Sequence, residues 1–386
     1  MRLNIVVLGL SITSSWGNGH ATTYRALIEA LAARGHAVTF LERDVAWYRA
    51  NRDLADPPWC RVALYRDFAE LGRFAPLVRD ADLVIVGSFV PEGAAVARWA
   101  TDTAAGITAF YDIDTPVTLA GLVRGDIDYL DAAVIPLFDL YLSFTGGPTL
   151  ALIEQTFGAR AARPLHCAVD PKIHAPQDVS PTLALGYIGT YSPDRQPPLE
   201  RLLIEPARRL PQMSFAVAGP QYPPDIAWPA NVARIDHLPP HEHARFYCSQ
   251  RFTLNVTRAD MVAAGFSPSV RLFEAAACGV PIITDRWAGL DTFFTPGTEI
   301  LIADGGAEVM EILREMPEER RRAIADAARR RVLRDHTAEH RAAELEAHVD
   351  EARTRAADLA RPRAATLDAA ARTISGTHGA PKVCTP

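Results

Sequence analysis

The sequence predicts an α/β protein made of two doubly wound, Rossmann-like domains that face each other across a cleft. Three observations support this fold class: short apolar runs alternate with helix-length segments in both halves, a proline-rich stretch separates the halves, and 386 residues suit two domains. The apolar run at the start is too short to cross a bilayer, and no later run reaches about 20 residues. We therefore expect a cytoplasmic protein without a transmembrane segment.

The first half, residues 1–165, opens with a βαβ pattern. Leu3–Leu10 is a continuous apolar run, Ala21–Arg34 has helical spacing, and Ala37–Leu41 is again strand-like. Such a unit requires a parallel sheet. Further strands are expected at Leu83–Val86, Ile107–Tyr111 and Leu140–Phe144.

Residues 166–182 lose this periodicity and contain several prolines, which is typical of a linker. The second domain is expected over residues 183–343. Its predicted strands are Leu185–Ile188, Phe215–Ala218, Phe252–Val256 and Pro281–Thr284, and its helices are Leu199–Leu210, Pro240–Ser249 and Ser269–Cys278. Residues 344–386 are expected to form a C-terminal helix and a disordered tail.

The charge balance and the cysteines exclude some classes of protein. With 46 acidic and 40 basic residues, the net charge is −6, which argues against a nucleic-acid partner. The five cysteines are scattered and include no CxxC pair, so single thiols are expected rather than disulfides or a zinc site. They are Cys60, Cys167, Cys248, Cys278 and Cys384.

The loop Ser11–His20 (SITSSWGNGH) joins the first strand to the first helix. Gly17 and Gly19 allow a ligand to approach the backbone, and the helix start offers free N–H groups. Neither GxGxxG nor a P-loop is present. The helix dipole disfavours a protonated His20, so this imidazole could accept a proton; alternatively, it caps or packs the turn.

Two aspartates, Asp112 and Asp114, follow the strand ITAFY and are expected on the cleft side of the sheet. They could bind sugar hydroxyls or serve as a base; a metal site is a further, less favoured alternative, because two carboxylates in a turn are common helix caps. Helix capping is the favoured interpretation of Asp114, because Thr-Pro follows it.

The second domain carries candidate phosphate ligands. In GYIGTYSPDR, Gly189 forms a turn after a strand, and Arg195 is suited to phosphate unless it is a plain surface arginine. Ser267-Pro268-Ser269 begins a helix whose N–H groups could face an anion. Glu274, on this helix, could accept hydrogen bonds from two ribose hydroxyls, and Arg258 and Arg271 add positive charge. Arg271 and Glu274 could instead pair with each other.

Three segments carry a family resemblance. RLFEAAACGVPIIT resembles the donor-binding signature of GT-B glycosyltransferases, HCAVDPKIHAP is similar to their interdomain VDxxxFxP stretch, and WGNGHATTYRAL resembles their glycine-rich acceptor loop. Over roughly residues 1–343 the chain resembles the CgeB-like, family-4-like group. The resemblance implies a hexosyl- or related transferase (EC 2.4) that moves a sugar from a nucleoside-diphosphate sugar to a small-molecule, glycan or protein hydroxyl, with no metal and no other cofactor.

The resemblance also assigns roles to residues. On the donor side, Ser267, Ser269 and Arg271 would meet the diphosphate, with Gly189, Arg195 and Arg258 nearby, and Glu274 would meet the ribose. On the acceptor side, His20 and Asp112 would be catalytic, and Trp16, Gly17, Asn18, Gly19 and Asp114 would bind the acceptor. His20 or Asp112 would deprotonate the acceptor in an inverting reaction, and the leaving phosphate would do so in a retaining one.

One position departs from the family pattern. Phe266 stands where the E-x7-E motif of family-4 enzymes has its first glutamate, which meets the donor sugar. Two alternatives therefore stay open: a GT-B-fold sugar-nucleotide epimerase and a non-catalytic sugar-nucleotide-binding protein.

Overall fold

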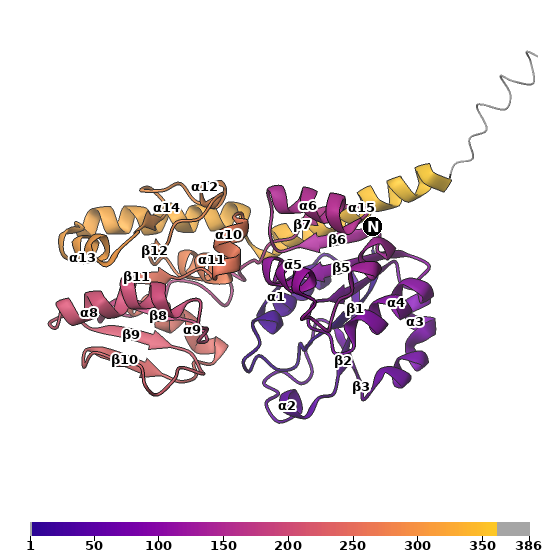
Figure 1. Ribbon diagram of the computed structural model, residues 1–386, viewed down its shortest axis with the longest axis horizontal. Helices are drawn as coiled ribbons and strands as arrows, with labels where there is room; N and C mark the ends of the chain where they lie inside the picture. Colours follow the sequence, from indigo (N-terminus) through magenta and orange to yellow (C-terminus); the bar gives the residue numbers. More distant parts are fainter. Residues whose placement is uncertain (1, 361–386) are drawn as a thin grey trace, which may run out of the picture.

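The computed structural model describes residues 2–360 and contains two α/β domains placed end to end (Figure 1). The predicted tail, residues 361–386, lies outside the described residues. The N-terminal domain contains β1 (Asn4–Gly9), α1 (Gly19–Ala33), β2 (Ala37–Arg43), α2 (Ala46–Arg49), β3 (Arg61–Tyr65), η1 (Phe68–Phe74), α3 (Ala75–Arg79), β4 (Leu83–Gly87), α4 (Gly93–Thr103), β5 (Ile107–Asp112), α5 (Thr115–Arg124), η2 (Ala132–Leu137), β6 (Leu140–Ser143), α6 (Pro148–Phe157) and β7 (Ala162–Pro164).

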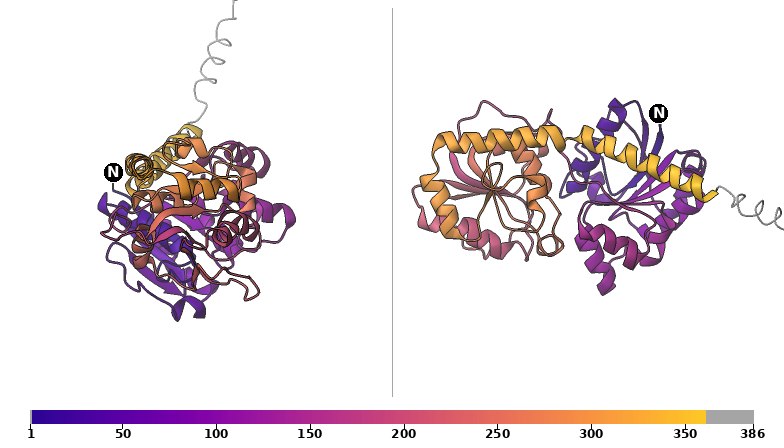
Figure 2. Two further views of the ribbon diagram at one scale, coloured as in Figure 1. Left: turned by 90° about the vertical axis from the view of Figure 1, so that its left-hand side faces the viewer. Right: turned by 90° about the horizontal axis from the view of Figure 1, so that it is seen from above.

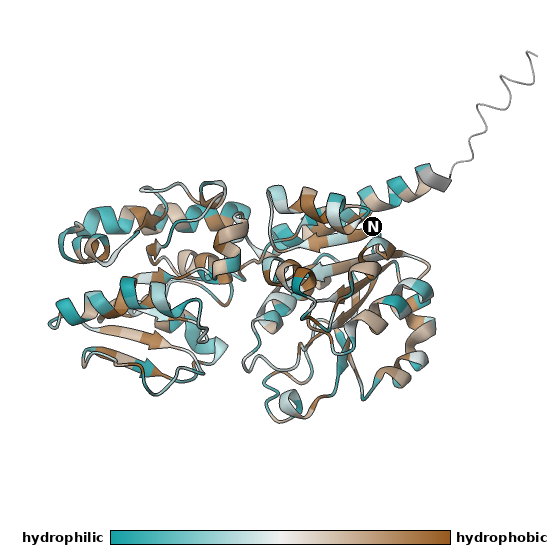
Figure 3. Ribbon diagram, in the orientation of Figure 1, coloured by the Kyte–Doolittle hydropathy of each residue, from teal (hydrophilic) through white to brown (hydrophobic). Residues whose placement is uncertain are grey.

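The strands of the N-terminal domain form a parallel sheet of order β3-β2-β1-β4-β5-β6-β7. Its central strands are buried on both faces, which explains their continuous apolar sequences. In Figure 3 these strands are largely brown, whereas the surrounding helices are a mixture of teal, white and brown.

The C-terminal domain contains β8 (Leu183–Ile188), α7 (Gln196–Leu199), the π-helical segment Glu200–Ile204, α8 (Glu205–Arg209), β9 (Phe215–Ala218), β10 (Val232–Ile235), α9 (Pro240–Cys248), β11 (Gln250–Asn255), α10 (Ala259–Ala264), α11 (Val270–Ala277), β12 (Ile282–Thr284), α12 (Leu290–Phe293), β13 (Leu301–Ile302), α13 (Gly306–Glu315) and α14 (Glu318–Asp335). Its parallel sheet has the order β10-β9-β8-β11-β12-β13.

Both sheets reverse their strand order at one point, between β1 and β4 in the first domain and between β8 and β11 in the second. Ligands of open α/β sheets bind beyond the carboxyl ends of the strands at such a reversal. The loops that leave these four strands meet in the interdomain space, so the topology itself locates the site.

The chain crosses between the domains a second time near its end. After α14, the helix α15 (Ala338–Ala360) returns to the N-terminal domain and packs against α1 (Figure 2). The crossing is secured by Ala338 N–H, which donates to Val169 O at 3.0 Å, and by an Arg34–Glu346 ion pair at 2.5 Å. Two connections therefore link the domains.

The predicted fold class of two doubly wound domains is confirmed, and every strand expected from the sequence is present. Four strands were not predicted: β3, β7, β10 and β13. None of the helices within residues 2–360 combines the length and the apolar character needed to span a bilayer.

Candidate active site in the interdomain cleft

The main cleft has a volume of about 570 Å³ and is lined by both domains. The N-terminal domain contributes the glycine loop, His20 and Asp114, and the C-terminal domain contributes Arg195, Arg258 and the start of α11. Positive charge therefore lies on one wall, and a His–Asp pair lies on the other.

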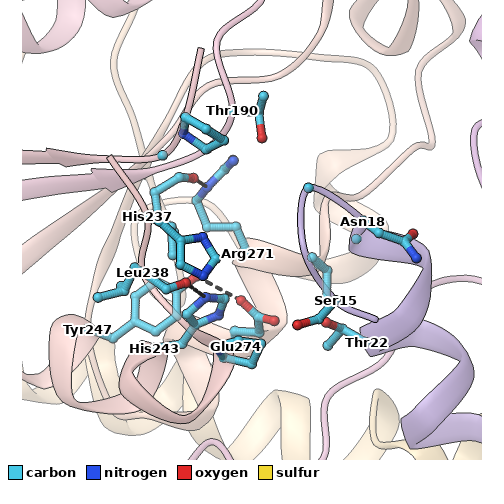
Figure 4. A pocket seen from close by; sticks show the side chains of 18 residues that line it. Ser15, Asn18, Thr22, Thr190, His237, Leu238, His243, Tyr247, Arg271 and Glu274 are labelled. Carbon is cyan, nitrogen blue, oxygen red and sulfur yellow. Dashed lines mark hydrogen bonds between the residues drawn. The ribbon is translucent and has the colours of Figure 1, made fainter. Parts of the chain in front are cut away.

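A second pocket of about 220 Å³ adjoins this cleft beside α11 (Figure 4). Gly189, Arg271 and Glu274 line it, and residues of the glycine loop lie opposite them. Val270 and Arg271 line both cavities, so the two cavities adjoin at the start of α11.

The start of α11 is shaped by Ser269 at its N-cap. The Ser269 hydroxyl makes no capping bond; it donates to Asn255 Oδ1 at 3.0 Å instead. The first N–H groups of a helix have no acceptor within the helix. They therefore stay available to an anionic ligand at the positive end of the helix dipole.

Arg271 is buried and held in one orientation. Its Nε donates to Ile188 O and its Nη1 to Asn255 Oδ1, both at 2.6 Å, and the guanidinium lies over the Tyr187 ring at 4.7 Å. Nη2 makes no hydrogen bond within residues 2–360. A fixed guanidinium with donor capacity left over is suited to a phosphate group.

Gly189 provides space rather than a hydrogen bond. Its N–H already donates to Ala218 O at 2.8 Å. A Cβ at this position would lie 2.5 Å from Tyr187 Oη and 3.0 Å from Arg271 Nη2. Glycine therefore leaves room for the Arg271 side chain beside the pocket.

Glu274 does not pair with Arg271 through a hydrogen bond but lies in a polar cluster of its own. Tyr247 Oη donates to Glu274 Oε2 at 2.8 Å, and His174 Nε2 lies 3.6 Å from Oε1. Burial raises the pKa of Glu274, but the nearby His174 and His243 and the Tyr247 hydrogen bond outweigh it and hold the pKa below its ordinary value. A buried carboxylate that stays ionised is a strong acceptor for hydroxyl groups.

Sequence reasoning missed His174, His243 and Tyr247. His174 lies in the linker, and His243 and Tyr247 lie in α9. None of them belongs to a recognisable motif, and they come close to Glu274 only in the folded chain. The i, i+4 spacing of His243 and Tyr247, which places them on one face of α9, was the available signal.

On the opposite wall, His20 and Asp114 face each other. His20 Nε2 lies 3.4 Å from Asp114 Oδ2, and Arg258 lies 4.0 Å from the other carboxylate oxygen. His20 Nδ1 has no hydrogen-bond partner among the described residues. Asp114 occupies the N-cap position of α5, but its side chain makes no capping bond. It is therefore free to orient the His20 imidazole.

Asp112 does not lie on the cleft side, contrary to the expectation. Its side chain is completely buried, accepts hydrogen bonds from Tyr141 Oη at 2.6 Å and Thr118 Oγ1 at 2.7 Å, and lines neither cavity. Asp112 is the last residue of β5 and its side chain points into the domain, whereas Asp114 lies beyond the strand, in the turn that leads to α5. Asp112 therefore cannot act directly as a base on a ligand in the cleft.

The burial of Asp112 predicts a pH-dependent stability. Burial raises its pKa from 3.8 to about 6, despite the Tyr141 and Thr118 hydrogen bonds. Between about pH 4 and 6 the folded chain then binds more protons at this group than the unfolded chain does, so its contribution to stability falls as pH rises. Relative to Asp112→Asn, the wild type is expected to lose up to about 3 kcal/mol of unfolding free energy from pH 4 to 7.

Denaturant unfolding of both proteins at several pH values measures this difference. Asp225→Asn, at an exposed loop position, is the control and should follow the wild type. A difference between wild type and Asp112→Asn that does not vary with pH would show that Asp112 has no raised pKa.

Ser267 is also placed differently from the expectation. It is fully buried and shares a hydrogen bond of 2.8 Å with Thr145 Oγ1 of the N-terminal domain, so it links the domains and lines neither cavity. The reason is that the chain turns at Phe266, whose carbonyl accepts from Gly146 N–H at 2.9 Å. Ser267 is therefore not available to a ligand in either cavity, whereas Ser269 and Arg271 line the cleft.

Arg195 and Phe266 differ in whether they line the cleft. Arg195 lines the cleft, although its Nε already donates to Ser192 Oγ and its Nη2 to Thr190 O. The Phe266 ring lies against Gly147 and Gly289, away from both cavities. This position therefore contributes no carboxylate to either cavity.

The glycine loop forms the mouth of the smaller pocket. Gly17 has a φ of +63°, which favours glycine, and Asn18 caps α1 by accepting from His20 N–H at 3.1 Å. Trp16 stacks on His237 of the other domain with ring centroids 6.1 Å apart. Gly17, Asn18 and Gly19 line both cavities.

Comparison with known proteins bears on this arrangement. Residues 195–347 match a family described as glycosyl transferase-like. Solved structures match nearly the whole chain. The fold is GT-B. No curated protein sequence gives a significant match.

Three GT-B structures illustrate the likeness. HepE of Anabaena, in complex with UDP-glucose, has a TM-score of 0.69 at 12% identity, covering 91% of this chain and 100% of HepE. Sucrose-phosphate synthase from Thermosynechococcus elongatus has a TM-score of 0.64 at 15% identity, covering 90% and 98%. An α-glucosyltransferase in complex with UDP-glucose and DNA has a TM-score of 0.67 at 12% identity, covering 91% and 100%.

Proposed function

We propose that the protein is a glycosyltransferase that transfers a sugar from a nucleoside-diphosphate sugar to a hydroxyl acceptor. The observation that carries this proposal is the continuous cleft past the start of α11, with Arg271 and an ionised Glu274 on one side and the His20–Asp114 pair on the other. The proposal is supported by the glycosyl transferase-like match over residues 195–347.

In this proposal the nucleotide occupies the smaller pocket. Glu274 accepts hydrogen bonds from the ribose hydroxyls, and the diphosphate lies at the start of α11 beside Arg271. As the bond to the sugar breaks, negative charge grows on the leaving diphosphate. The helix N–H groups and Arg271, together with Arg195 and Arg258, are already oriented to stabilise this charge, which lowers the barrier.

The acceptor and the donor sugar occupy the larger cavity. His20, held by Asp114, faces it from the N-terminal domain, and the glycine loop borders it. In this proposal His20 positions the acceptor hydroxyl and accepts its proton. Arg258, near Asp114, connects the two walls of the cleft.

A thermal-shift screen against UDP, GDP, ADP and dTDP tests the donor half, because a ligand that binds the folded state raises the melting temperature. UDP is a good starting point, because HepE and the α-glucosyltransferase were solved with UDP-glucose. Incubation of the matching sugar nucleotide with hydroxyl acceptors then tests transfer. An epimerised donor as sole product, or binding without turnover on any acceptor, would refute the transferase proposal.

His20→Gln is expected to lower kcat by about 100-fold or more and to change nucleotide affinity less than threefold, because general-base groups contribute about 10²–10⁴ in rate. Steady-state kinetics and calorimetric titration with the nucleoside diphosphate separate the two effects. His241→Gln, at an exposed position of α9, is the control. Equal losses of turnover and nucleotide affinity would instead indicate a structural role for His20.

A further inference from the structure

Behind the proposed ribose site, Glu274 belongs to a cluster with two histidines. One nitrogen of His174, one of His243 and one oxygen of Glu274 all lie within 4.8 Å of one another. His174 comes from the interdomain linker, His243 from α9 and Glu274 from α11. No zinc site was predicted from the sequence, because the cysteines are scattered and include no CxxC pair.

Three of the four histidine nitrogens in this cluster lack hydrogen-bond partners within the described residues, although His174 Nε2 lies 3.6 Å from Glu274 Oε1. His174 is 4% exposed, and neither its Nδ1 nor its Nε2 makes a hydrogen bond. The Nδ1 of His243 is also buried without a partner. A buried polar atom without a partner is unfavourable, so three such atoms in one cluster require an explanation.

The hydrogen bonds that the cluster does make are of the kind that orient metal ligands. His243 Nε2 donates to Leu238 O at 3.1 Å, which leaves a lone pair on Nδ1. Tyr247 Oη donates to Glu274 Oε2 at 2.8 Å, which leaves Oε1 for another contact. Outer hydrogen bonds of this kind, from a ring N–H to a backbone carbonyl and onto a carboxylate, orient metal ligands.

We propose that His174, His243 and Glu274 form a binding site for Zn²⁺. Two imidazoles and one carboxylate are a common ligand set for this ion, and three protein ligands leave a fourth position open. A third cavity, of about 190 Å³, lies between the linker and α1. All three residues line it, so a water molecule can reach this fourth position.

The site has a consequence for the nucleotide, and this part rests on the proposed function. Glu274 and His243 line both the smaller pocket, where the nucleotide is proposed to bind, and the third cavity. The cluster therefore stands between these two cavities. A carboxylate oxygen bonded to Zn²⁺ is a poor acceptor for ribose hydroxyls. Zn²⁺ and the nucleotide therefore oppose each other's binding, and by linkage the effect is reciprocal.

Zn²⁺ binding is tested first on the full chain without nucleotide. After the protein is stripped with EDTA and dialysed, competition with a chromophoric chelator is expected to show one tightly bound Zn²⁺ per chain. His174→Gln and His243→Gln should each lower this affinity by on the order of 100-fold, because even outer partners of a metal site contribute 10–100-fold. His241→Gln, exposed on the same helix, is the matched control and should bind as the wild type does.

Substitution with Co²⁺ tests the site without any mutation, because its visible absorption reports ligand number and geometry. A four-coordinate spectrum is the expected result. A six-coordinate spectrum, the absence of tight Zn²⁺ binding, or unchanged binding in folded His174→Gln and His243→Gln would each overturn the proposal. Circular dichroism shows whether these variants are folded.

The antagonism is tested by titrating the nucleoside diphosphate in EDTA and again with saturating Zn²⁺. The apparent Kd is expected to rise by about 10-fold or more with Zn²⁺, within the usual range of coupling between sites. The same Kd in both buffers would overturn the antagonism. Absence of nucleotide binding in EDTA would instead contradict the proposed function. The result of the Zn²⁺ titration without nucleotide does not depend on that function.

Discussion

Arg271→Lys is expected to lower kcat by at least about 100-fold, because removal of one oriented donor to a developing negative charge typically costs 10²–10³ in rate. A lysine carries the same charge but lacks the planar fork that now bonds Ile188 O and Asn255 Oδ1 and lies over Tyr187. Its ammonium would therefore not be held beside the diphosphate.

Steady-state kinetics with a sugar nucleotide measure this effect. Arg286→Lys, on an exposed arginine that pairs with Asp304, is the control and should leave turnover unchanged. If Arg271→Lys is folded and keeps wild-type kcat, then Arg271 does not stabilise the leaving group.

Glu274→Gln is expected to raise the Kd for the nucleoside diphosphate by about 10- to 150-fold, because a hydrogen bond to a charged acceptor contributes about 1.5–3 kcal/mol. The substitution preserves the size of the side chain and removes the negative charge. Calorimetric titration in EDTA measures the change without interference from a metal ion.

Two further variants make this result specific. Tyr247→Phe removes the donor to Glu274 Oε2 and is expected to have a smaller effect in the same direction. Glu311→Gln, on the exposed face of α13, should bind nucleotide as the wild type does. Unchanged affinity in Glu274→Gln would remove Glu274 from the nucleotide site.

The fold could be predicted because its central strands are buried on both faces. β1, β5 and β8 appear in the sequence as continuous apolar runs between helix-length segments. The missed strands β3, β7, β10 and β13 all lie at sheet edges; the first three contain an arginine, and β13 has only two residues. Edge strands need fewer apolar side chains, so hydrophobic patterning does not reveal them.

The candidate site was predicted best where one segment carries it. Arg271, Glu274 and Ser269 lie on or next to α11, and the structure places all three at the cleft or its smaller pocket. Asp112 and Ser267 could not be placed in the same way, because each stands where an element meets a loop, and the sequence does not show there whether a side chain faces the cleft or the core. Of the two aspartates expected on the cleft side, only Asp114 lines the cleft.

The histidine cluster could not be predicted, because it depends on contacts between distant segments. His174 in the linker approaches Glu274 across 100 positions of sequence. Nothing in the local pattern around His174 indicates this contact. Only packing of the linker against α9 and α11 brings the three side chains together.

A crystal structure of the protein with the nucleoside diphosphate that gives the largest thermal shift would test the proposed nucleotide site. We expect the diphosphate at the start of α11 within hydrogen-bonding distance of Arg271, and the ribose hydroxyls within hydrogen-bonding distance of Glu274. A nucleotide bound outside the interdomain cleft, or in the cleft without contact to either residue, would contradict it.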